Sequence, residues 1–240
     1  MPAAYDLSLP LASETSPTKH LEDGATTSER VPELYGPHKV RCEQILADTL
    51  GARRVLVVRA GLMVGPYDDT DRFTYWPVRV ARGGEILAPV GRDMPVQIID
   101  VRDVAAWIVG AIGRDLHGTF NVVGAPGSLC FGDVLEVCGE VTQSNARYHW
   151  ASSQFLETSG VAPWVEMPLW VPDVPELAGL RSVRNDRAWA AGLRYRALSE
   201  TVVDILAEYR LRPAGQPMNA GLDSVREAAL LKMNAESERP

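Results

Sequence analysis

The sequence has few cysteines and no long apolar run. Its three cysteines, Cys42, Cys130 and Cys138, are odd in number and show no CxxC spacing, so they predict neither a disulfide framework nor a zinc site. Reduced thiols, and an N-terminus without a basic and then apolar leader, predict a cytoplasmic protein. The most apolar stretch, 55–64, is interrupted by Arg59 and is too short to span a bilayer. We therefore expect no membrane partner.

Clusters of basic residues are also missing. The formal net charge is -7, and no five consecutive residues are all basic. Nucleic-acid binding draws its affinity from clustered Lys and Arg, so we expect no nucleic-acid partner. Asp68, Asp69 and Asp71 lie close together but lack the spacing of an EF-hand, which favours a polar turn and predicts no metal site. Hydrophobic residues make up 46% of the chain, which is enough to bury a sizeable core.

Apolar periodicity, broken by Gly and Pro, predicts alternating helices and strands. Residues 35–50 show helical spacing and end at Gly51, a typical C-terminal stop. Residues 54–63, RVLVVRAGLM, are mostly apolar and β-branched, as in a strand buried on both faces of a parallel sheet. Together with a loop over 7–33, this alternation indicates an α/β layered fold. Further helices are expected over 73–82, 104–112 with Asp103 as N-cap, from 131 onwards, 188–192 and 199–209, strands over 95–101 and 119–123, and either a surface helix or a frayed end over 225–233.

A Y-x-x-x-K pair opens the first of these helices. Tyr35 and Lys39 are four residues apart, so both side chains lie on one face of the helix. An ammonium beside a phenol favours the phenolate, which makes the phenol a usable proton donor or acceptor. The spacing alone is weak evidence, because a surface Lys and a partly buried Tyr at this separation are common in helices.

The order of motifs after this pair carries more information. Y-G-P-H-K is followed by V-L-V-V-R-A-G-L-M-V-G-P, V-Q-I-I-D-V-R-D-V-A-A-W-I, G-T-F-N-V-V-G and, from Val183 to Arg196, V-R-N-D-R-A-W-A-A-G-L-R-Y-R. From about residue 5 to residue 210, the chain resembles the extended, epimerase/dehydratase-type branch of the short-chain dehydrogenases/reductases. The resemblance implies NAD or NADP as cofactor and a small carbonyl or alcohol as substrate. It also implies that Tyr35 is the general acid/base, that Lys39 holds the nicotinamide ribose, and that the backbone of Ala60, Gly61 and Leu62 passes close to the nicotinamide.

The same resemblance divides the chain and suggests substrate contacts. We expect a loop-rich segment over 1–34, the C-terminal half of a Rossmann-like parallel sheet over 35–145, a small, mostly irregular or helical substrate subdomain over 146–212, and a polar tail over 213–240. The loop that follows Gly65-Pro66 lies at the substrate side of the family, so Asp71, Arg72 and Trp76 are candidate substrate contacts. Leu62 and Met63 stand where many nucleotide-sugar enzymes of this branch carry an Asn, which favours an apolar or aromatic small molecule.

The chain departs from the family pattern at its Gly-rich turn. The family begins with a strand and G-x-x-G-x-x-G, whose glycines let a pyrophosphate approach a helix N-terminus. The nearest equivalent, Gly124 to Gly132, has its third glycine two residues late and no βαβ unit after it. The family's catalytic Ser or Thr has no counterpart either. We therefore expect an N-terminally truncated enzyme that binds neither cofactor with micromolar affinity. The alternative is a non-catalytic relative used for binding or assembly.

A sheet without its first strands exposes the edge of a strand that is normally buried. We therefore expect a homodimer or a partner chain to cover that edge.

Overall fold

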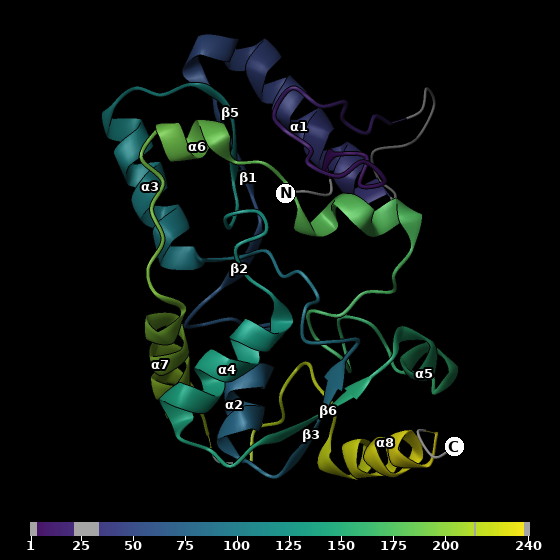
Figure 1. Ribbon diagram of the computed structural model, residues 1–240. Helices are drawn as coiled ribbons and strands as arrows, with labels where there is room; N and C mark the ends of the chain where they lie inside the picture. Colours follow the sequence, from purple (N-terminus) through teal and green to yellow (C-terminus); the bar gives the residue numbers. More distant parts are fainter. Residues whose placement is uncertain (1–3, 22–33, 214, 238–240) are drawn as a thin grey trace. The chain divides into compact units, whose positions relative to one another are not determined.

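A computed structural model describes residues 4–21, 34–213 and 215–237. The chain packs as two compact units, and each unit is built from segments that are separated in the sequence (Figure 1). The first unit comprises residues 1–63, 97–128 and 174–195. The second unit comprises residues 64–96, 129–173 and 196–240. Of the loop predicted over 7–33, residues 22–33 lie outside the described part of the chain.

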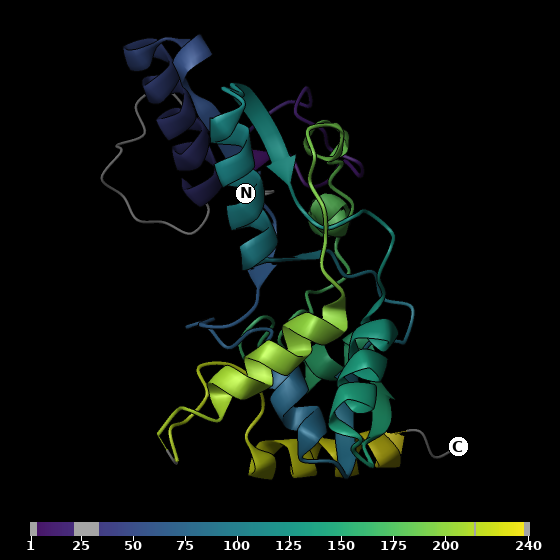
Figure 2. The same ribbon diagram turned by 90° about the vertical axis from the view of Figure 1, so that its left-hand side faces the viewer.

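The first unit is built around two parallel strands. Its elements are α1 (Tyr35–Leu50), η3 (Ala52–Arg54), β1 (Leu56–Ala60), β4 (Ile98–Asp100), α3 (Val101–Gly113), β5 (Gly118–Val122), η4 (Pro175–Arg181) and α6 (Asp186–Ala190). β1 and β5 pair in parallel, in a register that runs from Leu56 opposite Gly118 to Ala60 opposite Val122. A third strand, β2 (Leu62–Val64), begins at the end of this unit and pairs with β4. Figure 2 shows α1 and α3 next to the β1–β5 pair.

Helix α1 has the bounds that its periodicity predicts. It begins at Tyr35, and Gly51 ends it with φ +86°, a backbone conformation that favours glycine. The strand predicted over 54–63 is divided, because Gly61 interrupts it. The Gly61 N–H donates to the carbonyl of Val122 at 3.0 Å, and a Cβ at Gly61 would lie 3.2 Å from the Val123 side chain. This close approach of two backbones separates β1 from β2.

The N-cap predicted for α3 was wrong. Asp100, not Asp103, caps this helix, because β4 leads directly into α3 and leaves Asp100 in an extended conformation at the junction. Its side chain accepts a hydrogen bond from the Arg102 N–H at 2.8 Å. The helix therefore begins at Val101. Asp103 lies in its first turn, where a carboxylate interacts favourably with the helix dipole.

The core of the first unit joins α3, β5 and α6. Trp107 of α3 packs against Phe120 of β5 with ring centroids 5.1 Å apart. Its indole N–H lies 3.2 Å from the carbonyls of Ala188 and Ala191, so it fixes α6 to the same core. The buried indole ring adds apolar area to the core, and the hydrogen bonds of its N–H fix the orientation of the ring.

The second unit holds the other pair of parallel strands and most of the helices. Its elements are α2 (Tyr75–Ala81), β3 (Glu85–Pro89), α4 (Phe131–Thr142), β6 (Arg147–Ala151), α5 (Ser153–Thr158), α7 (Leu198–Tyr209) and α8 (Ser224–Ser237). β3 pairs with β6 from Glu85 opposite Arg147 to Pro89 opposite Ala151. Neither strand was predicted. The overall class is nevertheless the predicted one, a mixed α/β chain with short parallel sheets in a partial Rossmann-like arrangement.

Aromatic side chains form the core of the second unit. Trp76 of α2 is fully buried and lies edge-to-face with Phe131 of α4, with ring centroids 4.7 Å apart. Phe131 in turn contacts Trp150 of β6 at 6.3 Å. Edge-to-face geometry is favourable because the positive edge of one ring meets the negative face of the next.

Helix α8 is attached to this unit through a buried ion pair. Glu227 accepts a hydrogen bond from Arg79 Nε of α2 at 2.7 Å, and its other carboxylate oxygen accepts from the Leu87 N–H of β3 at 3.2 Å. Arg79 also donates to the carbonyls of Gly83 and Glu85. Within the described part of the chain, β3 pairs with β6 alone, so its other edge has no neighbouring strand. The Glu227 carboxylate supplies the acceptor for the Leu87 N–H at that edge.

None of the helices within residues 4–21, 34–213 and 215–237 is long and apolar enough to cross a membrane.

Candidate active site

The first turn of α1 brings Tyr35 and Lys39 together. The Lys39 ammonium nitrogen lies 5.5 Å from the centroid of the Tyr35 ring. Tyr35 is 42% exposed, and Lys39 is also exposed, so both side chains are accessible to a ligand. The pair therefore has the same-face geometry that its spacing predicts.

A buried ion pair sets where this turn lies along the sheet. Arg59, near the end of β1, donates to Glu43 of α1 from Nε at 3.0 Å and from Nη2 at 2.6 Å. Because the short η3 joins α1 to β1, the helix and the strand run in opposite directions (Figure 1). Tyr35 precedes Glu43 by eight residues, about 12 Å of helix. The first turn of α1 therefore extends toward the carboxyl end of β1.

The carboxyl end of β1 is where the chain carries Ala60, Gly61 and Leu62. Ligands of open α/β sheets bind outside the carboxyl ends of the strands. Gly61 has no side chain there, and the tight contact with Val123 leaves little room for one. The residues expected to lie near a nicotinamide are thus at the end of the strand toward which Tyr35 and Lys39 extend.

Sequence reasoning missed the residues that support this arrangement. The Arg59 guanidinium lies 4.8 Å from the centroid of the buried Tyr5 ring, and the Tyr5 hydroxyl donates to Asn121 Oδ1 at 2.7 Å. Burial raises the pKa of the Tyr5 phenol, so it stays a donor at neutral pH. A single Arg inside the apolar run of β1 was the one available signal, because its partners lie far away in the sequence.

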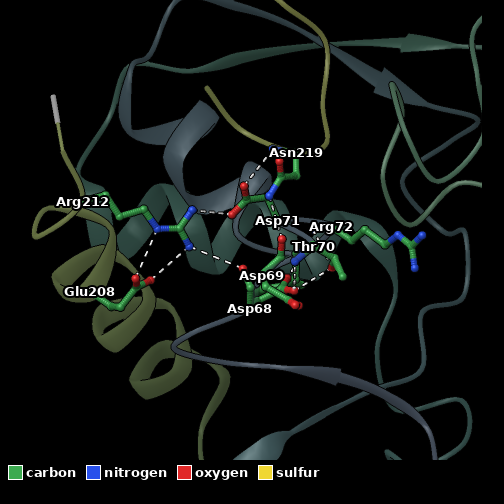
Figure 3. A network of polar contacts seen from close by, with 9 residues as sticks. Asp68, Asp69, Thr70, Asp71, Arg72, Glu208, Arg212 and Asn219 are labelled. Carbon is green, nitrogen blue, oxygen red and sulfur yellow. Dashed lines mark hydrogen bonds and ion pairs between the residues drawn. The ribbon is translucent and has the colours of Figure 1, made fainter. Parts of the chain in front are cut away.

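The candidate substrate contacts lie in the second unit, and two of them are buried. Asp71 is 1% exposed, and its carboxylate accepts from Arg212 Nη1 at 2.6 Å and from the Asn219 N–H at 2.9 Å (Figure 3). Trp76 is fully buried, and its indole N–H donates to the Pro168 carbonyl at 3.1 Å. Both side chains hold the unit together in this structure.

Arg72 differs from these two residues because its side chain is exposed. Its guanidinium lies 5.8 Å from the centroid of the Trp164 ring, within the range of a cation–π contact. It thus presents a positive charge beside an aromatic ring. Of the three candidate side chains, Arg72 is the exposed one.

The neighbouring carboxylates form a turn. Asp68 Oδ1 accepts from the Thr70 N–H at 3.0 Å and from the Thr70 hydroxyl at 2.6 Å (Figure 3). Arg212 is also held by Glu208, and the hydrogen bonds to Glu208 and Asp71 raise its pKa. Within the described residues, no group of three or more His, Cys, Asp or Glu side chains could hold a metal ion.

Comparison with known proteins gives structural matches only. No protein-family model and no curated protein matches the sequence. Among solved structures, RMD from Pseudomonas aeruginosa complexed with NADPH matches with a TM-score of 0.53 and 17% identity, over 85% of this chain and 63% of that one. The dTDP-4-dehydrorhamnose reductase of Bacillus anthracis in complex with NADP gives 0.56 and 16%, over 86% and 63%. The UDP-glucose 4-epimerase of Thermus thermophilus in complex with NAD gives 0.52 and 15%, over 85% and 64%.

The chain shares the fold of these three proteins. It spans less than two thirds of the length of each of them. The fold that the motif order predicts, a partial Rossmann-like arrangement, is thereby confirmed.

Proposed function

We propose that the protein belongs to an NAD(P)-dependent oxidoreductase or epimerase system that acts on a small carbonyl or alcohol, with Tyr35 and Lys39 as its catalytic pair. The main support for the proposal is the position of α1 along β1, which the Arg59–Glu43 ion pair sets. The Arg59–Glu43 ion pair directs the Tyr35–Lys39 turn toward the carboxyl end of β1, the usual ligand side of this fold. The cofactors named for the structural neighbours support the same class of chemistry.

In this proposal each side chain of the pair has a defined role. A bound nicotinamide supplies or accepts hydride at the carbon of the substrate. Tyr35 donates the proton to the substrate oxygen during reduction and removes it during oxidation. Lys39, beside the phenol, stabilises the phenolate and holds the ribose hydroxyls. Ala60, Gly61 and Leu62 line the nicotinamide, because the strand break at Gly61 presents backbone rather than a side chain.

The substrate is proposed to be small and partly apolar. Met63, directly after the nicotinamide-lining segment, is 48% exposed and offers an apolar contact rather than a hydrogen bond. Within the second unit taken by itself, Arg72 beside Trp164 is a candidate contact for an anionic or aromatic ligand. A metal has no part in the proposed chemistry.

The nicotinamide half of the cofactor is the probe that tests the site. We expect reduced nicotinamide mononucleotide to shift the backbone amide NMR signals of Ala60, Gly61 and Leu62 and of the first turn of α1. Lys39→Met should weaken this binding about tenfold, the effect of losing roughly 1.4 kcal/mol. Lys232→Met, at an exposed lysine of α8, serves as the matched control and should leave the titration unchanged. Shifts that avoid these segments would count against the proposed site.

NADPH should bind no more tightly than reduced nicotinamide mononucleotide. The sequence carries no G-x-x-G-x-x-G turn to receive the pyrophosphate, so the adenine half gains no contacts. A fluorescence titration with NADPH measures this directly. Micromolar affinity for NADPH would show that another segment of this chain replaces the Gly-rich turn.

The alternative is a non-catalytic relative that keeps the fold for binding or assembly, and the missing Gly-rich turn favours it. The two hypotheses differ in the expected nicotinamide titration, since a non-catalytic relative need not bind the probe at Lys39.

Under either hypothesis, β1 pairs with β5 and with no other strand in the described part of the chain. We propose that a second copy or a partner chain covers the free edge of β1.

A further inference from the structure

A short loop near the N-terminus, residues 7–12 with the sequence LSLPLA, presents two leucines to solvent. Leu7 is buried, whereas Leu9 and Leu11 are each 55% exposed. The loop thus places one leucine in the core of the first unit and leaves the other two outside it. Exposed leucine side chains gain nothing from the burial that stabilises a fold, so their presence here needs another explanation.

The backbone of this loop is held at several points although its two leucines are exposed. The Gly179 N–H of η4 donates to the Leu7 carbonyl at 2.6 Å. The Leu11 N–H donates to Ser182 Oγ at 3.2 Å. Gly179 also passes close to Leu9, because a Cβ at Gly179 would lie 2.3 Å from the Leu9 carbonyl oxygen. The exposed leucines are therefore carried by a backbone whose position is fixed.

Leu11 has a backbone conformation that is unfavourable for leucine. Its φ is +60°, in the left-handed region that glycine and asparagine adopt more easily. Its side chain is more than half exposed, so the core does not repay this cost. Residues held in such conformations cluster at ligand sites. A leucine at this position is thus explained by a contact that its side chain makes with a ligand.

The alternation of side chains along β1 and β5 shows on which face of the sheet Val123 lies. The Arg59 side chain reaches Glu43 of α1, so this face of β1 is the one that α1 covers. Asn121, the register partner of Arg59, points to the same face, and Val123 follows two residues later. A Cβ at Gly61 would lie 3.2 Å from the Val123 side chain. Val123 therefore lies on the α1 side, at the carboxyl ends of both strands.

The loop packs against this end of the sheet. Leu7 and Ala12, at the two ends of the loop, belong to one buried cluster with Val123. The loop thus lies on the α1 side of the sheet, at the end toward which the turn with Tyr35 and Lys39 extends. The exposed leucines between its two ends belong to the same end of the first unit as the proposed active site.

We propose that Leu9 and Leu11 form an apolar wall of the substrate site, and that the substrate carries a ring or a branched alkyl group beyond its carbonyl. This inference rests on the proposed function. The occupant is a small molecule, because two half-exposed leucines offer far less than the roughly 800 Å² per partner that a stable protein interface buries. Such a group gains affinity because it and the leucines leave water together.

Two methyl ketones test the wall by NMR of the full chain with labelled leucine methyl groups. Benzylacetone carries a benzyl group beside its ketone, and hydroxyacetone carries a hydroxyl in its place. We expect benzylacetone to shift the methyl signals of Leu9 and Leu11, and to bind at least about tenfold more tightly than hydroxyacetone. Equal affinities, or shifts confined to other leucines, overturn the proposal.

Variants of the two leucines separate binding from stability. Leu9→Ser and Leu11→Asn should each weaken benzylacetone binding about fivefold, whereas Leu9→Met keeps an apolar side chain and should retain it. Leu11→Asn should not lower the melting temperature, because asparagine accepts a positive φ. Leu211→Asn, at a leucine that is 84% exposed after α7, is the matched control and should leave binding unchanged. Unchanged binding in Leu9→Ser and Leu11→Asn, or an equal loss in the control, overturns the wall.

Reduced nicotinamide mononucleotide separates this proposal from the proposed function. It should shift the amide signals of Ala60, Gly61 and Leu62 equally in the original chain and in both wall variants. Benzylacetone binding that depends on the wall while these amides ignore the nucleotide supports the wall and counts against the proposed function alone. Sedimentation tests for another occupant, since an oligomer that Leu9→Ser dissociates would assign the leucines to a second copy and overturn the proposal.

Discussion

Replacement of Glu227 by alanine is expected to lower the free energy of unfolding by about 3–5 kcal/mol, the usual cost of breaking a buried ion pair from one side. The Arg79 side chain is 11% exposed and the Glu227 side chain is 5% exposed, so Arg79 would be left as a buried charge without its carboxylate. The Leu87 N–H would lose its acceptor at the same time. Urea unfolding followed by circular dichroism measures the change.

Two further variants show whether the ion pair is the cause. Glu236→Ala removes an exposed carboxylate from the same helix and should change stability by no more than about 0.5 kcal/mol. Combining Arg79→Met with Glu227→Leu removes both charges, and should recover most of the stability lost in Glu227→Ala, because no unpaired charge remains. If Glu227→Ala costs less than about 1 kcal/mol, the ion pair is not what holds α8 to β3.

Gly221→Ala is expected to destabilise the protein by about 3 kcal/mol, combining backbone strain with overpacking. Gly221 has φ +104°, which L side chains rarely adopt, and a Cβ there would lie 1.9 Å from the ring of the buried Tyr75. Tyr75 is part of α2 and has no room to move away, since it packs edge-to-face against Trp76 at 4.9 Å. Thermal and urea unfolding of the variant test this.

Gly215→Ala provides the matched comparison. Gly215 has φ +81°, but nothing lies within 4 Å of a Cβ at this position. This variant therefore carries only the backbone cost, about 1 kcal/mol. The difference between the two variants isolates the contact with Tyr75. Equal losses would mean that the ring does not restrict residue 221.

Local sequence patterns predicted those parts of the fold that depend on neighbouring residues. The bounds of α1 follow from its periodicity and from Gly51, and both act within a few residues. The cap of α3 was misplaced by three residues, because two aspartates flank the junction and only the exit of β4 selects Asp100. β3 and β6 were not predicted. Each strand is short, and each forms its ladder hydrogen bonds with a strand about 60 residues away in the sequence.

In the candidate site too, contacts between neighbouring residues were predictable from the sequence, and contacts between distant residues were not. The Tyr35–Lys39 geometry is a property of one helical turn and was predictable. The Arg59–Glu43 ion pair, which fixes that turn along β1, required knowing how α1 folds back on the strand. Asp71 was named as a candidate substrate contact from the family resemblance alone. Its ion pair with Arg212 could not be predicted from the sequence, because Arg212 lies 141 positions further along the chain.

The interleaving of the two units also bears on how the polypeptide acquires its structure during synthesis. The first unit is completed only by residues up to 195, and the second only by residues from 196 onward. Neither unit has all of its segments until the later part of the chain has been synthesised. Early segments such as β1 therefore remain without some of their native contacts during synthesis. Because folding slows when contacts join distant residues, nascent chains should depend on chaperones until the segments after residue 196 have emerged.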